Sequence, residues 1–187
     1  MTNTIAFVHI GSFSHANHQL ATALHKQFPG HALEMIGIRT LILQQKAVCL
    51  RNLRFLVQEY GKELLRGRRS FRRTFFATTY LFRQMSALAA QQVARLRPAF
   101  SLQTQSLFDA SAPGINNFVY TDHTVLAHFQ YLGFSRQQLA DYLFTPAWVQ
   151  LERKIYHHAT LNFAMSDFVV ESIIEDYGCP RHKVIQA

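Results

Sequence analysis

The 187-residue sequence has only two cysteines, Cys49 and Cys179, and neither belongs to a CxxC pair. Two isolated cysteines exclude a disulfide-stabilised scaffold and provide no zinc-ligand spacing. The ten histidines predict no metal site either, because no cysteine or carboxylate completes a ligand set at a diagnostic distance along the chain. We therefore expect ordinary thiols, no metal ion and no permanently bound cofactor.

Long hydrophobic runs are also missing. No apolar run approaches the roughly 20 residues that a membrane-spanning helix needs. Residues 1–4 carry no basic charge, and the apolar run after them is interrupted by His9 and ended by Gly11, which does not fit a secretory signal peptide. Because 49% of the residues are apolar and the length is near that of one domain, we expect a single globular, cytoplasmic domain.

Three glycine-containing signatures are absent. The sequence has neither the GxGxxG pattern of dinucleotide-binding turns nor the GxxxxGK[ST] pattern of phosphate-binding loops. It also lacks the GxSxG pattern that places a hydrolase serine on a strand-to-helix turn. These absences disfavour a nucleotide-dependent oxidoreductase, a P-loop enzyme and a serine hydrolase.

Acidic residues are scarce between residues 39 and 97. This stretch holds 13 of the 19 lysines and arginines but only Glu59 and Glu63, a net charge of +11. The rest of the chain carries six basic and nine acidic residues, a net charge of −3. The basic character therefore belongs to one segment, which predicts that this segment meets an anionic partner.

The centre of the basic segment combines arginines with aromatic residues. Five arginines lie within eight residues, namely Arg66, Arg68, Arg69, Arg72 and Arg73, and Phe75, Phe76, Tyr80 and Phe82 follow them. Arginines beside exposed rings suit the headgroups of an anionic membrane, where each basic residue contributes about 1 kcal/mol. We expect peripheral contact with the inner face of a membrane. The alternatives are a solvated charged face with the rings in the core, or nucleic-acid phosphates, for which no motif is present.

The first forty residues show a strand, a turn, a helix and a second strand. The apolar run Thr4–Ile10 ends in a glycine turn, and Asn17–Phe28 has apolar residues at helical spacing. Pro29 and Gly30 then break the chain before the apolar run Ala32–Ile38. This βαβ pattern requires a crossover between parallel strands, which is right-handed in nearly all proteins.

The remaining chain continues the alternation. We predict helices over 41–65 and 71–96 and beginning near Ser135, Pro146 and Ser166, and strands over 99–104, 118–121, 161–165 and 183–186. Ser135 and Gln138 form a capping box, and Thr145 and Ser166 have the residue types of N-caps. Alternating strands and helices predict one α/β domain with a Rossmann-like, mostly parallel, doubly wound sheet.

Ligands of open parallel sheets bind at the carboxyl ends of the strands, so the residues that follow each strand are the candidates for a site. These residues are Gly11, Ser12 and Ser14 after the first strand, Asp122 and His123 after FVYT, and Ser166 after LNFAM. A histidine can exchange a proton near neutral pH, and a neighbouring carboxylate can fix its tautomer. The alternatives are a glycine turn without a ligand, a histidine bonded to the backbone, and a serine that only caps a helix.

Four stretches resemble one protein family. They are IAFVHIG, LATALHKQFPGH, VYTDHT and NFAMSDFVVESIIEDYGCPRHKVIQ, of which the last, from Ser166 to Val184, is the most specific. Together they resemble the N-terminal domain of GT-B glycosyltransferases of the large retaining family 4, which includes sucrose synthase-like and bacterial lipopolysaccharide or phosphoinositol mannosyl transferases. Residues 41–97 match only in being helical.

The resemblance implies an acceptor-binding domain of a transferase that uses a nucleotide sugar, UDP- or GDP-linked, as co-substrate. It implies that His123 is the histidine that contacts the donor sugar, and that the acceptor is a glycan or a lipid-linked glycan. The family's donor-binding domain would follow the strand KVIQA, so we expect this chain to need that domain or a partner subunit for activity. A non-catalytic scaffold of the same fold, docking through its basic helices, is the alternative.

Overall fold

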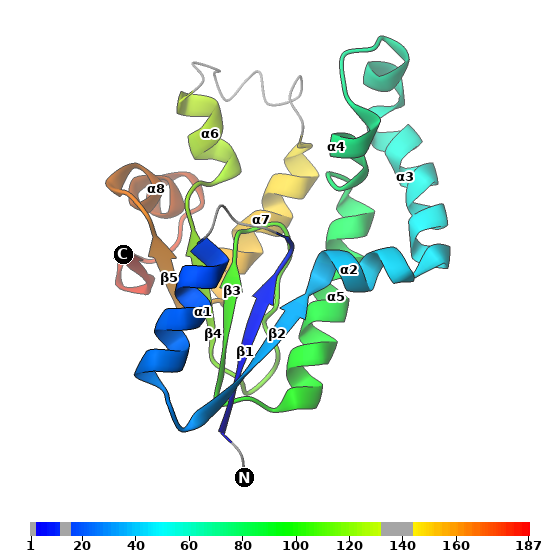
Figure 1. Ribbon diagram of the computed structural model, residues 1–187. Coiled ribbons are helices and arrows are strands. Elements are labelled where there is room, and N and C mark those ends of the chain that lie inside the picture. Colours follow the sequence, from blue (N-terminus) through cyan, green and yellow to red (C-terminus); the bar gives the residue numbers. More distant parts are fainter. Residues whose placement is uncertain (1–2, 12–15, 132–143) are drawn as a thin grey trace.

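A computed structural model describes residues 3–11, 16–131 and 144–187. Six strands form one sheet in the order β2-β1-β3-β4-β5-β6, and every neighbouring pair is parallel (Figure 1). The strands are β1 (Asn3–His9), β2 (His31–Gly37), β3 (Phe100–Thr104), β4 (Asn117–Thr121), β5 (Leu161–Ala164) and β6 (Val184–Gln186). The predicted α/β fold with a Rossmann-like parallel sheet is confirmed.

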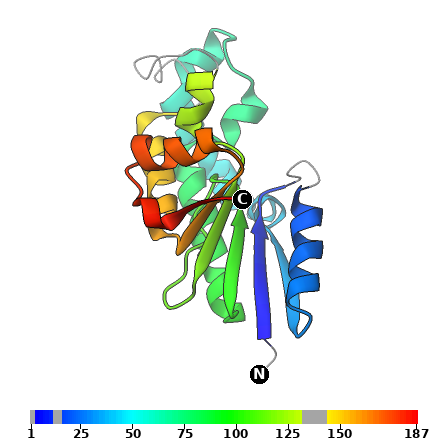
Figure 2. The ribbon, with the colours of Figure 1, turned by 90° about the vertical axis from the view of Figure 1, so that its left-hand side faces the viewer.

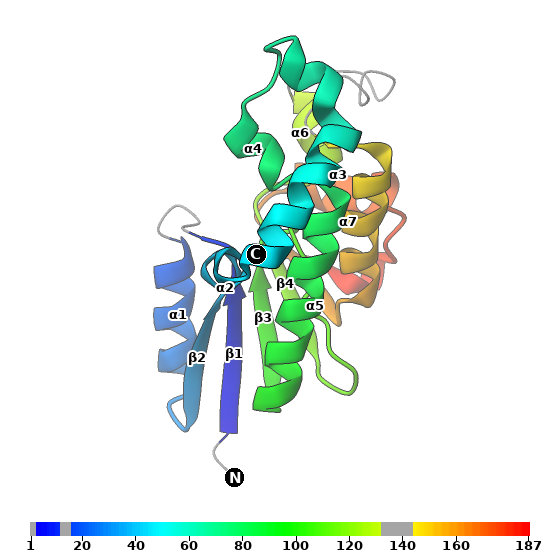
Figure 3. The same ribbon diagram turned by 90° about the vertical axis from the view of Figure 1, so that its right-hand side faces the viewer.

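Helices lie on both faces of the sheet (Figures 2 and 3). α1 (Ala16–Gln27) joins β1 to β2 on one face, whereas α5 (Thr79–Leu96) and α7 (Pro146–His158) lie on the other. The chain moves from β1 outward to β2 and then returns past β1 to β3. Because both crossovers have the same hand, this reversal places α1 and α5 on opposite faces, as in a doubly wound sheet.

Both long helices predicted in the basic segment are interrupted. The first is α2 (Ile38–Gln44) followed by α3 (Lys46–Leu65), and the second is α4 (Phe71–Phe75) followed by α5. Thr78 causes the second break, because its extended backbone precedes α5 and its hydroxyl accepts the Leu81 N–H at 3.1 Å. Apolar residues recur at helical spacing across both breaks, so periodicity alone does not detect them.

The helical signals nearer the C-terminus have three outcomes. The caps at Thr145 and Ser166 are confirmed, since their hydroxyls accept the backbone N–H groups three residues on. The capping box at Ser135 lies outside the described residues. An unpredicted helix, α6 (Val125–Tyr131), begins after Thr124, whose hydroxyl accepts the Ala127 N–H at 2.9 Å.

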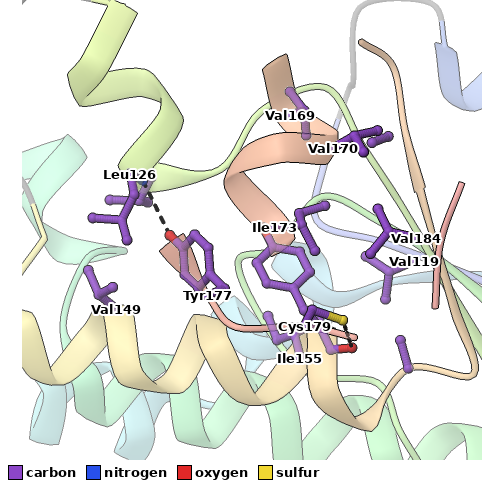
Figure 4. Packing of buried hydrophobic residues seen from close by; sticks show 14 of the residues in the cluster. Val119, Leu126, Val149, Ile155, Val169, Val170, Ile173, Tyr177, Cys179 and Val184 are labelled. Atoms are coloured by element: carbon purple, nitrogen blue, oxygen red, sulfur yellow. Dashed lines mark hydrogen bonds between the residues drawn. The ribbon is translucent and has the colours of Figure 1, made fainter. Parts of the chain in front are cut away.

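The C-terminal segment packs against α7. After Ser166 comes α8 (Asp167–Glu171), which continues through a wider π turn (Ser172–Asp176). Figure 4 shows Ile173 and Tyr177 of this segment facing Val149 and Ile155 of α7, and all four side chains belong to one buried cluster. The apolar residues of the segment therefore face the core along one side of a helix, as their spacing in the sequence predicts.

A buried carboxylate lies in the same region. Glu152 of α7 is fully buried, and its oxygens accept hydrogen bonds from Ser106 Oγ (2.6 Å), the Val125 N–H (3.3 Å) and Tyr156 OH (3.0 Å). Tyr177 OH donates a fourth bond. Burial raises the pKa of Glu152, and the four donors oppose that rise. One side chain thus connects the end of β3, the start of α6, α7 and the C-terminal segment.

The opposite side of the sheet is only partly covered. Phe100, Phe118 and Phe163 form a row across β3, β4 and β5, with ring centroids 5.5 and 6.2 Å apart, and Phe28 after α1 extends it. A groove of about 460 Å³ lies between α1 and this row. It is lined by Leu20, Leu24, Phe28, Phe100, Leu102, Phe118, Tyr120, Phe163 and Ala187. Parallel sheets usually have both faces covered, so this apolar face is an exception.

We predict that Glu152→Ala lowers the free energy of unfolding by about 1 to 3 kcal/mol, because it leaves buried donors without an acceptor. Denaturant unfolding measures the change. Glu175→Ala, which removes an exposed carboxylate from the C-terminal segment, is the control and should change stability by about 0.5 kcal/mol or less. Equal effects of the two substitutions would contradict the structural role of Glu152.

The raised pKa of Glu152 also predicts a pH dependence. The folded protein holds the proton more tightly than the unfolded chain, so the contribution of Glu152 is greatest below the ordinary glutamate pKa. It is lost as the pH rises through the raised pKa of the folded state. The stability of the parent relative to Glu152→Gln should therefore fall with rising pH, and a difference that does not vary with pH would contradict this.

Candidate functional site

The carboxyl ends of β1, β3, β4 and β5 form one continuous edge, because these strands are parallel neighbours. Gly11 follows β1, His123 follows β4 and Ser166 follows β5. Backbone bonds extend the sheet slightly past the strand ends, from the Gln105 N–H to Tyr120 (2.9 Å) and from the Met165 N–H to Thr121 (3.1 Å). The predicted residues that the structure describes are thus brought to one edge, where parallel sheets bind ligands.

Asn17, in the first turn of α1, is bonded to the residues that follow β1 and end β3. Its amide Nδ2 donates to the Gly11 carbonyl at 2.6 Å, and its Oδ1 accepts the Thr104 hydroxyl at 2.9 Å. The ends of β1 and β3 are thereby joined through one side chain. Ser12 and Ser14, predicted here as substrate-binding residues, lie outside the described residues. The Asn17–Thr104 link was not predicted, although a threonine at a strand end is a recognisable signal.

Gln105, directly after β3, has an unusual backbone. Its φ is +67°, in the left-handed region that residues with a Cβ rarely adopt. The buried side chain of Gln103 holds it there, because Gln103 Nε2 donates to the Gln105 carbonyl (2.8 Å) and to that of Phe108 (2.5 Å), while its Oε1 accepts the Ala110 N–H (2.8 Å). Strained backbone positions cluster at functional sites, and this one lies on the candidate edge.

His123 is the most accessible titratable side chain of this arrangement. Its Nδ1 lies 2.6 Å from Asp122 Oδ1, and the side chains of the two residues are 54% and 39% exposed. The hydrogen bond with Asp122 raises the pKa of His123, and partial burial opposes this. Nε2 makes no hydrogen bond to any described residue. The ring is therefore oriented by Asp122 with its second nitrogen available to a ligand.

His128 of α6 lies close to His123. The two ring centroids are 6.0 Å apart, and burial together with the neighbouring His123 lowers the pKa of His128. The two pKa shifts have opposite directions, so His123 becomes protonated at a higher pH than His128. This second histidine was not predicted, because the helix that carries it was not.

Ser166 is used as a helix cap. Its Oγ accepts the Val169 N–H at 3.4 Å, as the structural alternative expected. The side chain is half-buried at the start of α8, which is only five residues long. Contact of its hydroxyl with a substrate stays a prediction.

The five arginines lie after α3 and not at the strand ends, with Arg66, Arg68 and Arg69 between α3 and α4 and Arg72 and Arg73 in α4. Arg66, Arg68 and Arg72 are exposed. Arg69 is half-buried, with its guanidinium carbon 5.1 Å from the centroid of the Tyr60 ring. Arg73 lies in α4.

The aromatic residues that follow the arginines are not exposed as expected. Phe82 is buried, Phe75 and Phe76 pack against the core under α2 and α5, and Tyr80 stacks on Phe55 at 4.4 Å. The expectation of exposed rings beside the arginines is therefore wrong for these four residues. Phe82 lies on the buried side of α5 and Phe75 and Phe76 precede that helix, and composition does not reveal which side of a helix faces the core. Phe71, before them, is 56% exposed.

Two further observations concern metals and membranes. In residues 3–11, 16–131 and 144–187, no three His, Cys, Asp or Glu side chains gather so that they could hold a metal ion. Among the helices of these same ranges, none has the length and apolar character needed to cross a bilayer.

The chain matches no family model, no curated protein and no solved structure. Its likeness to glycosyltransferases consequently depends on the four stretches quoted above. The geometry of the carboxyl edge is independent of that likeness, because it follows from the fold and the side chains alone.

We predict that Asp122→Asn lowers the pKa of His123, because it removes the carboxylate that stabilises the protonated ring. Titration of the histidine resonances by NMR measures the shift. Asp109→Asn, which removes a carboxylate bonded to His158, should leave the pKa of His123 unchanged. The raised pKa means that the pair stabilises the fold below the ordinary histidine pKa and loses this contribution as pH rises through the raised value. An unchanged pKa in Asp122→Asn would contradict the pairing.

Proposed function

We propose that this chain is the acceptor-binding domain of a nucleotide-sugar-dependent, retaining glycosyltransferase of the GT-B type. The observation that carries the proposal is His123, exposed at the carboxyl end of the central strand β4 and oriented by Asp122. Gly11, bonded to Asn17, and the strained Gln105 support it, because both lie on the same edge. The resemblance of VYTDHT and of the segment from Ser166 to Val184 agrees with this location.

In such a reaction His123 would contact the sugar of a UDP- or GDP-linked donor. Glycosyl transfer develops positive charge on the sugar ring and negative charge on the departing phosphate, and preorganised polar groups stabilise that separation. Asp122 keeps Nδ1 occupied, so Nε2 is the atom that would meet a sugar hydroxyl. Gly11 and Ser166 would border the donor and acceptor, and Ser12 and Ser14 belong to the same predicted site.

The proposed enzyme has a second, donor-binding domain, supplied in the same polypeptide or by a partner subunit. Positioning two substrates in a closed cleft can contribute roughly 7 to 11 kcal/mol to lowering a barrier. The 187 residues alone provide one wall of that cleft. We therefore expect them to show no useful turnover by themselves. The acceptor would be a glycan or a lipid-linked glycan of the cell envelope, met on the cytoplasmic side.

A non-catalytic binding module of the same fold is the second candidate. It is favoured by the exposed arginines and apolar residues of α3 and its following turn, and α3 and α4 project beyond the carboxyl edge of the sheet. In that case the basic helices dock to an anionic surface or partner, and His123 has no chemical role. The two candidates therefore differ in what His123 does.

We predict that His123→Ala in the two-domain enzyme lowers kcat by roughly 100- to 1000-fold, the usual loss when a polar group that stabilises transition-state charge is removed. His158→Ala is a matched control, because His158 Nδ1 lies 2.7 Å from Asp109 Oδ2 and its side chain is equally exposed, at 54%. It lies near the amino end of β5, at the opposite ends of the strands from His123. Release of UDP or GDP from the sugar donor is the measurement.

Two outcomes would contradict the role of His123 in a transferase. They are full activity of His123→Ala and equal loss of activity in His123→Ala and His158→Ala. Turnover of a nucleotide sugar by the 187-residue chain alone would instead contradict the expected need for a second domain.

A further inference from the structure

Helix α3 faces the protein with one side only. Asn52, Leu56 and Tyr60 are buried, and their spacing of four residues places them on one side of the helix. Asn52 Nδ2 donates to the Phe75 carbonyl and Tyr60 OH to the Ala77 carbonyl, so this side is bonded to the segment that leads into α5. The other side of α3 faces solvent over its whole length.

The solvent-facing side carries large apolar residues. Leu50 is 70% exposed, Val57 65% and Leu65 91%, and Leu53 is also exposed. Spacings of seven and eight residues align Leu50, Val57 and Leu65 along one side of the helix. A helix that only bordered water would carry polar residues there, so this apolar stripe marks an interaction surface.

Cations lie directly beside the stripe. Arg51, Arg54 and Lys62 are exposed on the same solvent-facing half of α3. The two acidic residues of the helix, Glu59 and Glu63, are half-buried, and Glu59 accepts the Thr79 N–H and hydroxyl. The accessible half of α3 therefore combines apolar and positively charged side chains without an exposed carboxylate.

The turn after α3 repeats this combination. Phe71 is 56% exposed and is flanked by the exposed Arg68 and Arg72. Figure 1 shows α3 and α4 rising beyond the carboxyl edge of the sheet as a projecting arm. The apolar stripe and the exposed phenylalanine thus belong to one arm, which protrudes from the rest of the domain.

We propose that this arm docks to an anionic lipid bilayer, with α3 lying parallel to the membrane surface. Leu50, Val57 and Leu65 would enter the boundary between headgroups and acyl chains, and the long stems of the arginines would let their charged ends reach lipid phosphates. A second copy of the chain is a poorer partner, because it would bring the same cations against one another. Nucleic acid would pair the cations but leave the apolar stripe in water.

This inference deepens the second candidate function, because it names the occupant of the docking surface and the residues that meet it. It does not require His123 or a nucleotide sugar, so failure of the transferase experiment would not affect it. It also revises the residues expected to meet the membrane, since the rings of Phe75, Phe76, Tyr80 and Phe82 are directed into the protein and the aliphatic residues of α3 take their place.

The test is sedimentation of the 187-residue chain with vesicles of phosphatidylcholine alone or mixed with phosphatidylglycerol. We expect strong binding to the mixed vesicles, weak binding to the neutral ones, and weaker binding at high salt. Arg51→Gln with Arg54→Gln should weaken binding roughly 30-fold, equivalent to about 2 kcal/mol. Leu50→Ser with Val57→Ser should weaken it by at least about tenfold.

A matched control replaces two exposed apolar residues elsewhere. Met165→Ser with Ile185→Ser alters the end of β5 and β6, and this variant should bind like the parent. A second readout reports which side chain enters the bilayer. Trp148 is the only tryptophan and is fully buried, so Val57→Trp adds one exposed reporter, which brominated lipids should quench. Ala23→Trp on α1 should not be quenched.

Four results would overturn the proposal. The first two are equal binding to neutral and mixed vesicles, and unchanged binding of the Leu50 and Val57 variant. The others are no quenching of Val57→Trp, and a loss of vesicle binding in the Met165 and Ile185 control equal to that of the Leu50 and Val57 variant. Concentration-dependent association in solution that the Leu50 and Val57 variant abolishes would instead assign the stripe to a second copy of the chain.

Discussion

The buried carboxylate of Glu152 connects the parts of the structure on which the candidate site depends. It accepts hydrogen bonds from Ser106 after β3 and from the Val125 N–H at the start of α6, two residues beyond His123. Tyr177 donates to it from the C-terminal segment. A buried acceptor with several donors is strong when complete and costly when incomplete, because no water can replace a lost partner. The segment that carries His123 is therefore fixed by a buried side chain that is not itself part of the candidate site.

The carboxyl edge shows a similar division between exposed and supporting residues. Gln103 is buried and never reaches the surface, yet its amide holds Gln105 in a left-handed conformation. Asn17 joins Gly11, directly after β1, to Thr104 at the end of β3. Because these supports are side-chain amides with fixed geometry, the strand ends keep their spacing without a ligand. Preorganisation of this kind reduces the free energy that a ligand must supply to order its own site.

Features with a local signal were predictable from the sequence. The βαβ start, the caps at Thr145 and Ser166, and the strand-end position of His123 all depend on residues within a few positions of one another. The breaks before α3 and α5 were not predictable, because apolar residues recur at helical spacing across each of them. The partners of Glu152 were not predictable either, since Ser106 and Tyr177 lie 46 and 25 residues away in sequence. The link from Asn17 to Thr104 spans 87 residues.

The half-covered face of the sheet affects how the domain behaves in concentrated solution. Phe100, Phe118 and Phe163 form an apolar surface that attracts a like surface on another molecule. The formal charge of +8 opposes that attraction at long range, and most of it comes from the segment containing α3 and α4. Salt screens this repulsion but leaves the apolar attraction, so the colloidal stability of the domain should decline as ionic strength rises.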